Sequence, residues 1–170
     1  APAGHRDVLG VDGPRDFARD ARFNEYDHQS LLRYFEGDRL QAIKASGDRR
    51  EYFAAIRSAM QKWSRHDDVV AGGESWSEFG ARIGAGVTAA CGGLGRDDNV
   101  LIVTSGGVIG RYTSEVLDAG ADAAIQLNLQ IRNTGVTEVI RPASGNARLV
   151  SFNSIPHLER SDRADAITHS

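Results

Sequence analysis

The sequence predicts an α/β fold in three layers, with a mainly parallel mixed sheet between two layers of helices. Two observations carry this prediction. Several segments repeat apolar residues at intervals of three and four, the spacing of amphipathic helices. Residues 99–104 instead form an uninterrupted apolar run, which is typical of a strand buried on both faces in a parallel sheet.

The helical pattern can be followed along the chain. Residues 1–24 contain Gly, Pro and charged residues, and they indicate a connection with one weak strand at 8–11. Ser75 and Glu78 have the spacing of a capping box, which predicts a helix start there. We expect two short helices between Gln29 and Gly47, and longer ones over 49–65, 75–91, 108–117 and 123–131.

The expected strands do not complete a sheet. Residues 136–140 and 148–152 flank Ser144-Gly145-Asn146 and predict a hairpin. A strand at 99–104 that is buried on both faces needs neighbours on both sides, and only this hairpin and the weak segment are available. We therefore expect a chain truncated at its N-terminus, in which 99–104 keeps a bare edge or an exposed apolar face. The polar tail, 159–170, is expected to be mobile.

Composition narrows the function classes. A length of 170 residues fits one domain, and 41% hydrophobic with 25% charged residues is typical of a folded protein. The net charge of −3, without a basic stripe, argues against nucleic acid as a partner. The single cysteine, Cys91, fits a reducing compartment. No membrane partner is expected and the cytoplasm is the expected location, because the sequence has neither a long apolar span nor a signal pattern.

The strongest chemical signal is Thr104-Ser105-Gly106-Gly107, where the apolar run meets a helix. Ligands of α/β sheets bind at the carboxyl ends of strands, and glycine amides at a helix N-terminus suit phosphate. The motif predicts a phosphate or another anion as ligand. The alternative is that Gly106 and Gly107 only form a tight turn.

These residues also carry a resemblance to a family. Asn99–Gly110 resembles the second signature of histidine phosphatases, the phosphoglycerate-mutase-like superfamily, in which an apolar strand ends in His-Gly-Gly; Ser105 stands where the family has His. Phe23–His28 resembles the segment that supplies the family's acid/base carboxylate, with Glu25 at the matching position. Residues 133–140 and 150–158 are similar to its closing hairpin, so the resemblance covers 20–158.

The resemblance implies a phosphomonoester hydrolase that acts through a phosphohistidine on a small phosphorylated substrate, without a cofactor or metal. It implies a single domain over 1–158, with 29–73 as a helical lid over the substrate. Glu25 would be the proton donor, and Ser105, Gly106 and Gly107 would bind phosphate. His28 and Arg111 are further pocket candidates, and the lid adds Arg33, Arg39, Tyr52 and Trp63 as unranked ones.

The family's nucleophile is a His in an Arg-His-Gly motif, and this motif does not occur in the sequence. The nearest match, Arg65-His66-Asp67, lies at the end of an expected helix and lacks the glycine. We therefore expect this chain alone to be inactive. Ser105 could donate one hydrogen bond to a phosphoryl oxygen but carries no positive charge, so it would stabilise the transition state less than His.

Two other functions stay open. One is a noncatalytic module that binds anions on the phosphatase scaffold and needs no nucleophile. The other is a serine hydrolase, because Ser105, Asp118 or Asp122, and His157 follow the order of a Ser-Asp-His triad. The nucleophile elbow of such hydrolases requires glycine at the position of Val103, which makes this second alternative the weaker one.

Overall fold

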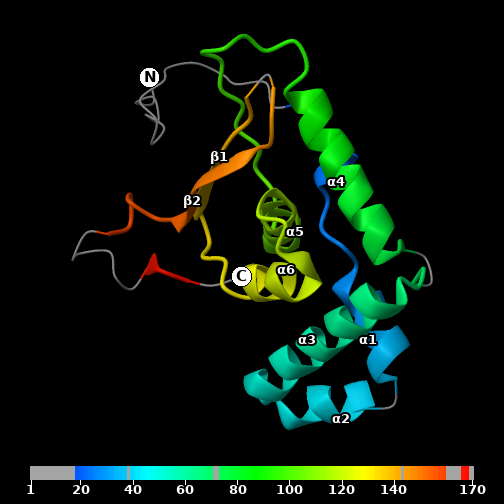
Figure 1. Cartoon of the computed structure of the whole chain (residues 1–170). Helices are drawn as coiled ribbons and strands as arrows, with labels where there is room; N and C mark the ends of the chain where they lie inside the picture. The colour runs from blue at the N-terminus through cyan, green and yellow to red at the C-terminus, as the bar shows by residue number, and fades with distance from the viewer. Residues whose placement is uncertain (1–17, 38, 71–72, 143, 160–165, 169–170) are drawn as a thin grey trace, which may run out of the picture.

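The computed structural model describes residues 18–37, 39–70, 73–142, 144–159 and 166–168 (Figure 1). The weak strand predicted at 8–11 lies outside these residues. Their elements are a short 3-10 helix, six α-helices and two strands: η1 (Ala21–Phe23), α1 (His28–Glu36), α2 (Arg39–Ser46), α3 (Arg49–His66), α4 (Trp76–Ala90), α5 (Gly106–Val116), α6 (Gly120–Asn128), β1 (Val136–Ile140) and β2 (Arg148–Ser154).

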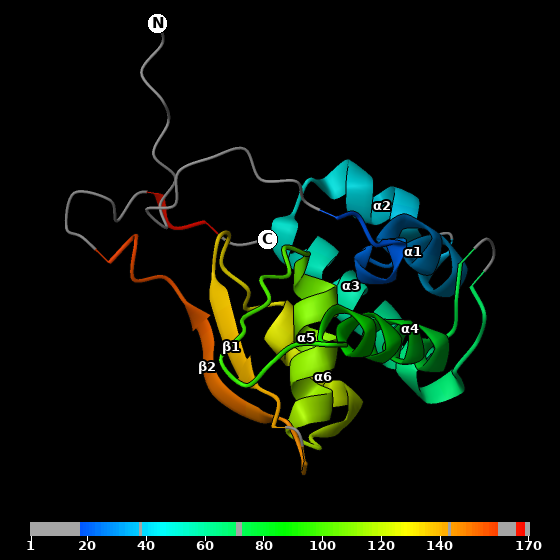
Figure 2. The ribbon, with the colours of Figure 1, turned by 90° about the horizontal axis from the view of Figure 1, so that it is seen from above.

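The helices form two groups. Helices α1, α2 and α3 lie together at one end of the molecule, away from the β1–β2 hairpin (Figure 1). Seen from above, α5 and α6 lie between the hairpin and α4 (Figure 2). None of the helices in the described part of the chain is long and apolar enough to cross a bilayer.

The predicted helices are confirmed within one to three residues at most of their ends, because the local signals that start them are present. The hydroxyl of Ser75 accepts a hydrogen bond from the Glu78 amide at 3.2 Å, and the Glu78 carboxylate accepts one from the Ser75 amide at 2.8 Å. This is the predicted capping box. The carboxylates of Asp27 and Asp48 cap α1 and α3 in the same way, each by accepting backbone amide hydrogen bonds.

A cluster of aromatic rings joins the two groups of helices. Trp63 on α3 packs against Trp76 and Phe79 on α4, with ring centroids 5.3 and 5.6 Å apart. Tyr26, just before α1, packs against Trp63 and Phe79 at 5.5 and 5.7 Å. The indole nitrogen of Trp63 donates to the Glu74 carbonyl at 3.1 Å, so its polar atom stays bonded inside the core.

A buried carboxylate connects α1 to its neighbours. The side chain of Glu36 is only 1% exposed and forms ion pairs with Lys62 at 2.9 Å and Arg39 at 3.3 Å. Lys62 also donates to the Phe35 carbonyl at 3.1 Å. An isolated buried charge would oppose folding, so these partners are what allows Glu36 to lie between α1 and α3.

The predicted hairpin is confirmed, with β2 two residues longer than expected. Its strands pair antiparallel, with register shifts between Val136 and Val139. Asn153 holds the hairpin to the end of α6: its side-chain oxygen accepts from the Arg132 amide at 2.9 Å and its side-chain nitrogen donates to the Gln130 carbonyl at 2.7 Å.

Most of the tail expected to be mobile lies outside the described residues, but the Thr168 carbonyl accepts from the Asn133 amide at 2.9 Å.

The central strand predicted at 99–104 is not formed. These residues belong to no strand in the described structure, whose one sheet contains only β1 and β2. Leu101 and Val103 are 59% and 77% exposed, so the expected exposed apolar face is present. The physical reason is that a strand exists only when a neighbour supplies its hydrogen bonds, and β1 and β2 pair with each other. The described residues thus form an α/β structure without the predicted three-layer parallel sheet.

Removing the Phe79 ring tests the aromatic core. Phe79 is fully buried, so Phe79→Ala should lower the free energy of unfolding by about 3–5 kcal/mol. Phe53→Ala is the matched control, because Phe53 is 38% exposed and should cost about 1 kcal/mol or less. Urea unfolding followed by circular dichroism measures both. Equal losses for the two variants would mean that the aromatic cluster is not the centre of the core.

The Glu36 ion pairs predict a pH dependence of stability. Burial of the Glu36 carboxyl acts to raise its pKa, but hydrogen bonds from Lys62 and Ser58 and the charges of Lys62 and Arg39 outweigh it, so the pKa lies below its usual value. The unfolded chain therefore binds more protons, and the stabilisation by Glu36, present above about pH 4.5, is lost as the pH falls through the folded-state pKa.

Glu36→Gln should accordingly flatten the acid side of a plot of unfolding free energy against pH. Glu159→Gln, an exposed position, controls for the loss of one carboxyl group. An acid limb as steep in Glu36→Gln as in the unmodified chain would rule out this contribution.

Candidate functional site

The candidate site is built on the N-terminus of α5. Ser105 is the N-cap residue, and Gly106 and Gly107 form the first turn, where they are buried. The first amides of a helix have no partner within the helix and carry partial positive charge, so a negative group is favoured there. Neither glycine has a positive φ, so a left-handed backbone conformation does not require glycine at these two positions.

Glu25 supplies the negative group. Its Oε2 accepts a hydrogen bond from the Gly107 amide at 2.8 Å, and its Oε1 accepts one from the Tyr26 amide at 3.1 Å. The structure thus brings Glu25 to the glycine turn, although 82 positions of the sequence separate Glu25 from Gly107. The family resemblance implies that these two segments lie together.

The close approach also explains one glycine. A Cβ on Gly107 would lie 2.7 Å from a ring carbon of Tyr26 and would overlap the Glu25 carboxylate. Any other residue at 107 would therefore have to push the Glu25 loop away. The glycine at 107 is needed for packing rather than for an unusual backbone conformation.

The side chains of Arg82 and Thr104 hold the Glu25 loop in place, and the sequence analysis did not single out Arg82. Arg82 on α4 donates to the carbonyl oxygens of Arg22 and Asn24 at 2.7 and 2.8 Å, and its guanidinium is paired with Glu74 at 2.6 Å. The Thr104 hydroxyl donates to the Phe23 carbonyl at 2.7 Å. No spacing in the sequence connects Arg82 to residues 22–24, so only the packing of η1 against α4 identifies it.

The Tyr26 hydroxyl belongs to the core and not to the site. Burial raises its pKa far above the usual range, and the nearby charge of Glu25 raises it further, so the hydroxyl stays neutral. It donates to the Met60 sulfur at 3.3 Å and lies 3.4 Å from the Asn128 side-chain nitrogen, which donates to it. Tyr26 therefore positions its neighbour Glu25 from the core side.

Ser105 presents a hydroxyl without a partner. Its Oγ is buried and has no hydrogen bond in the described part of the structure, and it does not cap α5. The serine-hydrolase triad is accordingly not assembled. His157 Nε2 contacts the Thr134 hydroxyl at 2.8 Å, and Asp122 accepts from Gln61 at 3.3 Å.

The remaining predicted pocket residues lie elsewhere. His28 is the first residue of α1 and is exposed. Arg111 points toward α4: its guanidinium lies 5.3 Å from the ring centre of Trp76, contacts Gly80, and pairs with Glu115 at 3.3 Å. The structure therefore brings neither side chain into hydrogen-bond contact with Glu25 or the glycine turn.

The four unranked lid candidates have different surroundings. Trp63 is buried in the aromatic core, Arg39 is paired with Glu36, and Arg33 is exposed beside Gln29. Tyr52 is half-buried next to Phe53. No group of three or more His, Cys, Asp or Glu side chains that could hold a metal ion occurs among the residues described.

Comparison with known proteins supplies one match. The model of the histidine phosphatase superfamily, branch 1, matches residues 38–155, which is more than half of the chain. No curated protein and no solved structure matches at a significant level. The matched range includes Ser105, Gly106, Gly107 and the hairpin, whereas Glu25 and His28 precede it.

Adding a methyl group at Gly107 tests the packing of the site. Gly107→Ala should destabilise the chain by about 1–3 kcal/mol, because the Cβ forces the Glu25 carboxylate and the Tyr26 ring to move. Gly84→Ala is the control: its Cβ would have one ordinary contact, 3.8 Å from Glu115, so it should stabilise α4 by up to about 1 kcal/mol. Thermal unfolding measures the stability of both variants. A Gly107→Ala variant as stable as the unmodified chain would contradict the described position of Glu25.

Proposed function

Because the chain belongs to the histidine phosphatase superfamily, we propose that it is part of a phosphomonoester hydrolase that works through a phosphohistidine. The observation that supports this most is the Glu25 carboxylate on the Gly107 amide. It joins the proposed proton donor to the proposed phosphate site, and it does not depend on the family match, since Glu25 lies outside the matched residues.

The proposed reaction has two steps. A histidine nitrogen attacks phosphorus, the bond from phosphorus to the ester oxygen breaks, and Glu25 gives its proton to that oxygen as it leaves. A water molecule then attacks the phosphohistidine while Glu25 takes up a proton, which releases phosphate and restores the histidine. The chain's Arg65-His66-Asp67 does not match the nucleophile motif, so we assign the nucleophile to an Arg-His-Gly segment outside these 170 residues.

The segment that carries Arg-His-Gly would also supply the missing partner of residues 99–104. We propose that the strand carrying Arg-His-Gly pairs with residues 99–104, which would convert their exposed apolar face into the centre of a three-layer, mainly parallel sheet. The carboxyl ends of both strands would then meet at the N-terminus of α5. This is the edge at which α/β sheets bind their ligands.

The phosphate pocket is assigned to Ser105, Gly106 and Gly107. Glu25 now accepts the Gly107 amide hydrogen bond, so an incoming phosphoryl group has to compete for that amide. We assign displacement of Glu25 to this moment: the phosphoryl oxygen replaces the carboxylate at Gly107, and the freed carboxyl group faces the leaving oxygen. The Ser105 hydroxyl, which has no other partner in the described structure, donates to a second oxygen.

His28 and Arg111 remain secondary proposals for the pocket. His28 is solvent-exposed three residues after Glu25 and is free to contact a substrate. Arg111 would first have to leave its contact with Trp76. A small phosphorylated substrate and a cytoplasmic setting, suggested by the lone Cys91, complete the proposal.

Activity measurements test the proposal. The 170-residue chain alone should not hydrolyse p-nitrophenyl phosphate, whereas the chain joined to a strand that ends in Arg-His-Gly should. In the joined protein Glu25→Gln should lower kcat by about 10²–10⁴-fold, because the amide still accepts from Gly107 but cannot donate the proton. Glu159→Gln, which removes a carboxylate from an exposed position outside the site, is the control and should leave kcat within about twofold.

Other outcomes would favour the alternatives. Ester cleavage by the chain alone, with labelling of Ser105 by a fluorophosphonate, would indicate a serine hydrolase. A joined protein that binds phosphate near Gly106 without hydrolysing esters would indicate the noncatalytic anion-binding module. The replacement of the family's His by Ser105 favours the second of these, since the hydroxyl brings no charge to the site.

A further inference from the structure

Charge is unevenly divided along the chain. Residues 28–66, which contain α1 to α3, hold eight Lys and Arg against four Asp and Glu, a net charge of +4. The whole chain has a net charge of −3, so the rest of it carries −7. The three-helix end is therefore a positive region on a negative molecule, and such a region attracts anions.

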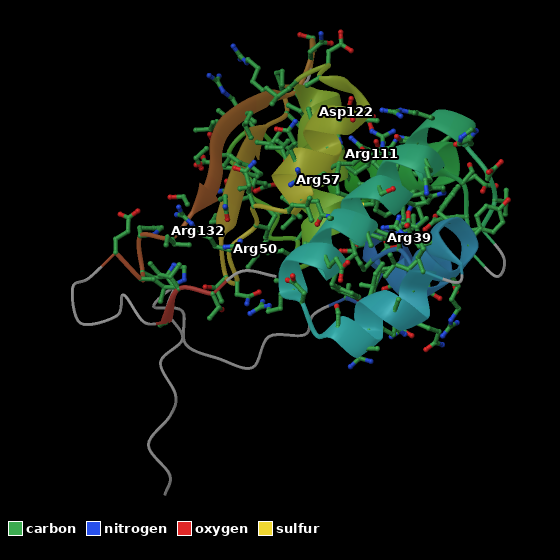
Figure 3. All side chains as sticks on the ribbon, turned by 90° about the horizontal axis from the view of Figure 1, so that it is seen from below. Arg39, Arg50, Arg57, Arg111, Asp122 and Arg132 are labelled. Carbon is green, nitrogen blue, oxygen red and sulfur yellow. The ribbon has the colours of Figure 1, made fainter. Side chains whose placement is uncertain are left out.

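The positive charge is concentrated along one helix. An open groove of about 440 Å³ lies on the outer face of α3, and Arg49, Arg50 and Arg57 line it together with Phe53 and Gln61. The labelled Arg50 and Arg57 lie along this helix (Figure 3).

None of the three guanidinium groups has a carboxylate partner among the described residues. The nearby carboxylates are bonded to other groups: Asp48 accepts from the Arg50 backbone amide at 2.8 Å, and Glu51 accepts from the Ser46 hydroxyl at 2.8 Å. An anion bound between three positive side chains would reduce the repulsion among them.

The groove is separate from the site at Gly107. The face of α3 that points to the core contains Ala55, Ala59, Met60 and Trp63, and it is this face that contacts Tyr26. Arg50 and Arg57 are both exposed, on the other side of the helix. A ligand in the groove would therefore not touch the Glu25 loop.

An aromatic ring accompanies the arginines. Phe53 is 38% exposed, and the guanidinium of Arg49 lies 5.9 Å from its ring centre. Arginine and phenylalanine together offer a planar surface on which a flat ring can stack. The groove thus combines multiple positive charges with an apolar surface.

From these features we propose that the outer face of α3 is a second anion site, which binds a small, multiply charged phosphate compound that carries a flat ring. Arg50 and Arg57 hold the phosphate groups, and Phe53 with Arg49 packs against the ring. The site needs no nucleophile and does not depend on the phosphatase reaction. Binding and hydrolysis can therefore be tested separately.

Calorimetric titration of the 170-residue chain with ATP and with inorganic triphosphate tests the site. At low salt ATP should bind with a Kd below about 1 mM, and about 0.3 M NaCl should weaken binding by screening. The double variant Arg50→Gln/Arg57→Gln should raise the Kd for both compounds by about five- to tenfold. Phe53→Leu should weaken ATP binding severalfold and leave triphosphate binding unchanged.

The matched control is Arg96→Gln/Arg141→Gln, which removes the same charge from exposed positions outside the three-helix end. It should change either Kd by less than about twofold, since distant charges are screened. The proposal is overturned if neither compound binds below about 1 mM, or if the control weakens binding as much as the groove variant. Equal Kd values for ATP and triphosphate in every variant would contradict the proposal that the ligand carries a flat ring.

Discussion

The packing of Tyr26 against Trp63 and Phe79 is the interaction on which the described structure depends. Trp63 belongs to α3, Phe79 to α4, and Tyr26 to the segment that precedes α1, so one cluster of rings holds three separate parts of the chain. The residue before Tyr26 is Glu25. Its carboxylate reaches the Gly107 amide because the neighbouring ring is fixed in the core, and the geometry of the site is in this sense a product of hydrophobic packing.

Local structure could be predicted from the sequence wherever the signal was itself local. The capping box at Ser75 and Glu78 and the Ser-Gly-Asn turn of the hairpin involve neighbours a few residues apart, and both are present. The run at 99–104 was different. Its composition is that of a buried strand, but strand formation depends on a partner from elsewhere, and no pattern within six residues can supply one.

The candidate site shows the same division. The glycine turn was predicted from Thr104 to Gly107, whereas the position of Glu25 came only from a family resemblance in a segment that the family model does not match. The hydrogen bond of 2.8 Å from the Gly107 amide supports that position of Glu25. The chemical role of Glu25 is a proposal. Arg82 could not have been predicted, because its hydrogen bonds to residues 22 and 24 arise only from the fold.

Residues 100–103, which precede α5, affect how the isolated chain associates in solution. No backbone hydrogen bond links residues 100–103 to another described residue, and Val100, Leu101 and Val103 are exposed. A segment rich in β-branched residues, whose backbone has no hydrogen bond to another described residue, is a template on which a second copy can add a strand. A net charge of only −3 gives little repulsion between copies. Association of the isolated chain should therefore grow with its concentration and with added salt, and a soluble charged fusion partner would keep the copies apart.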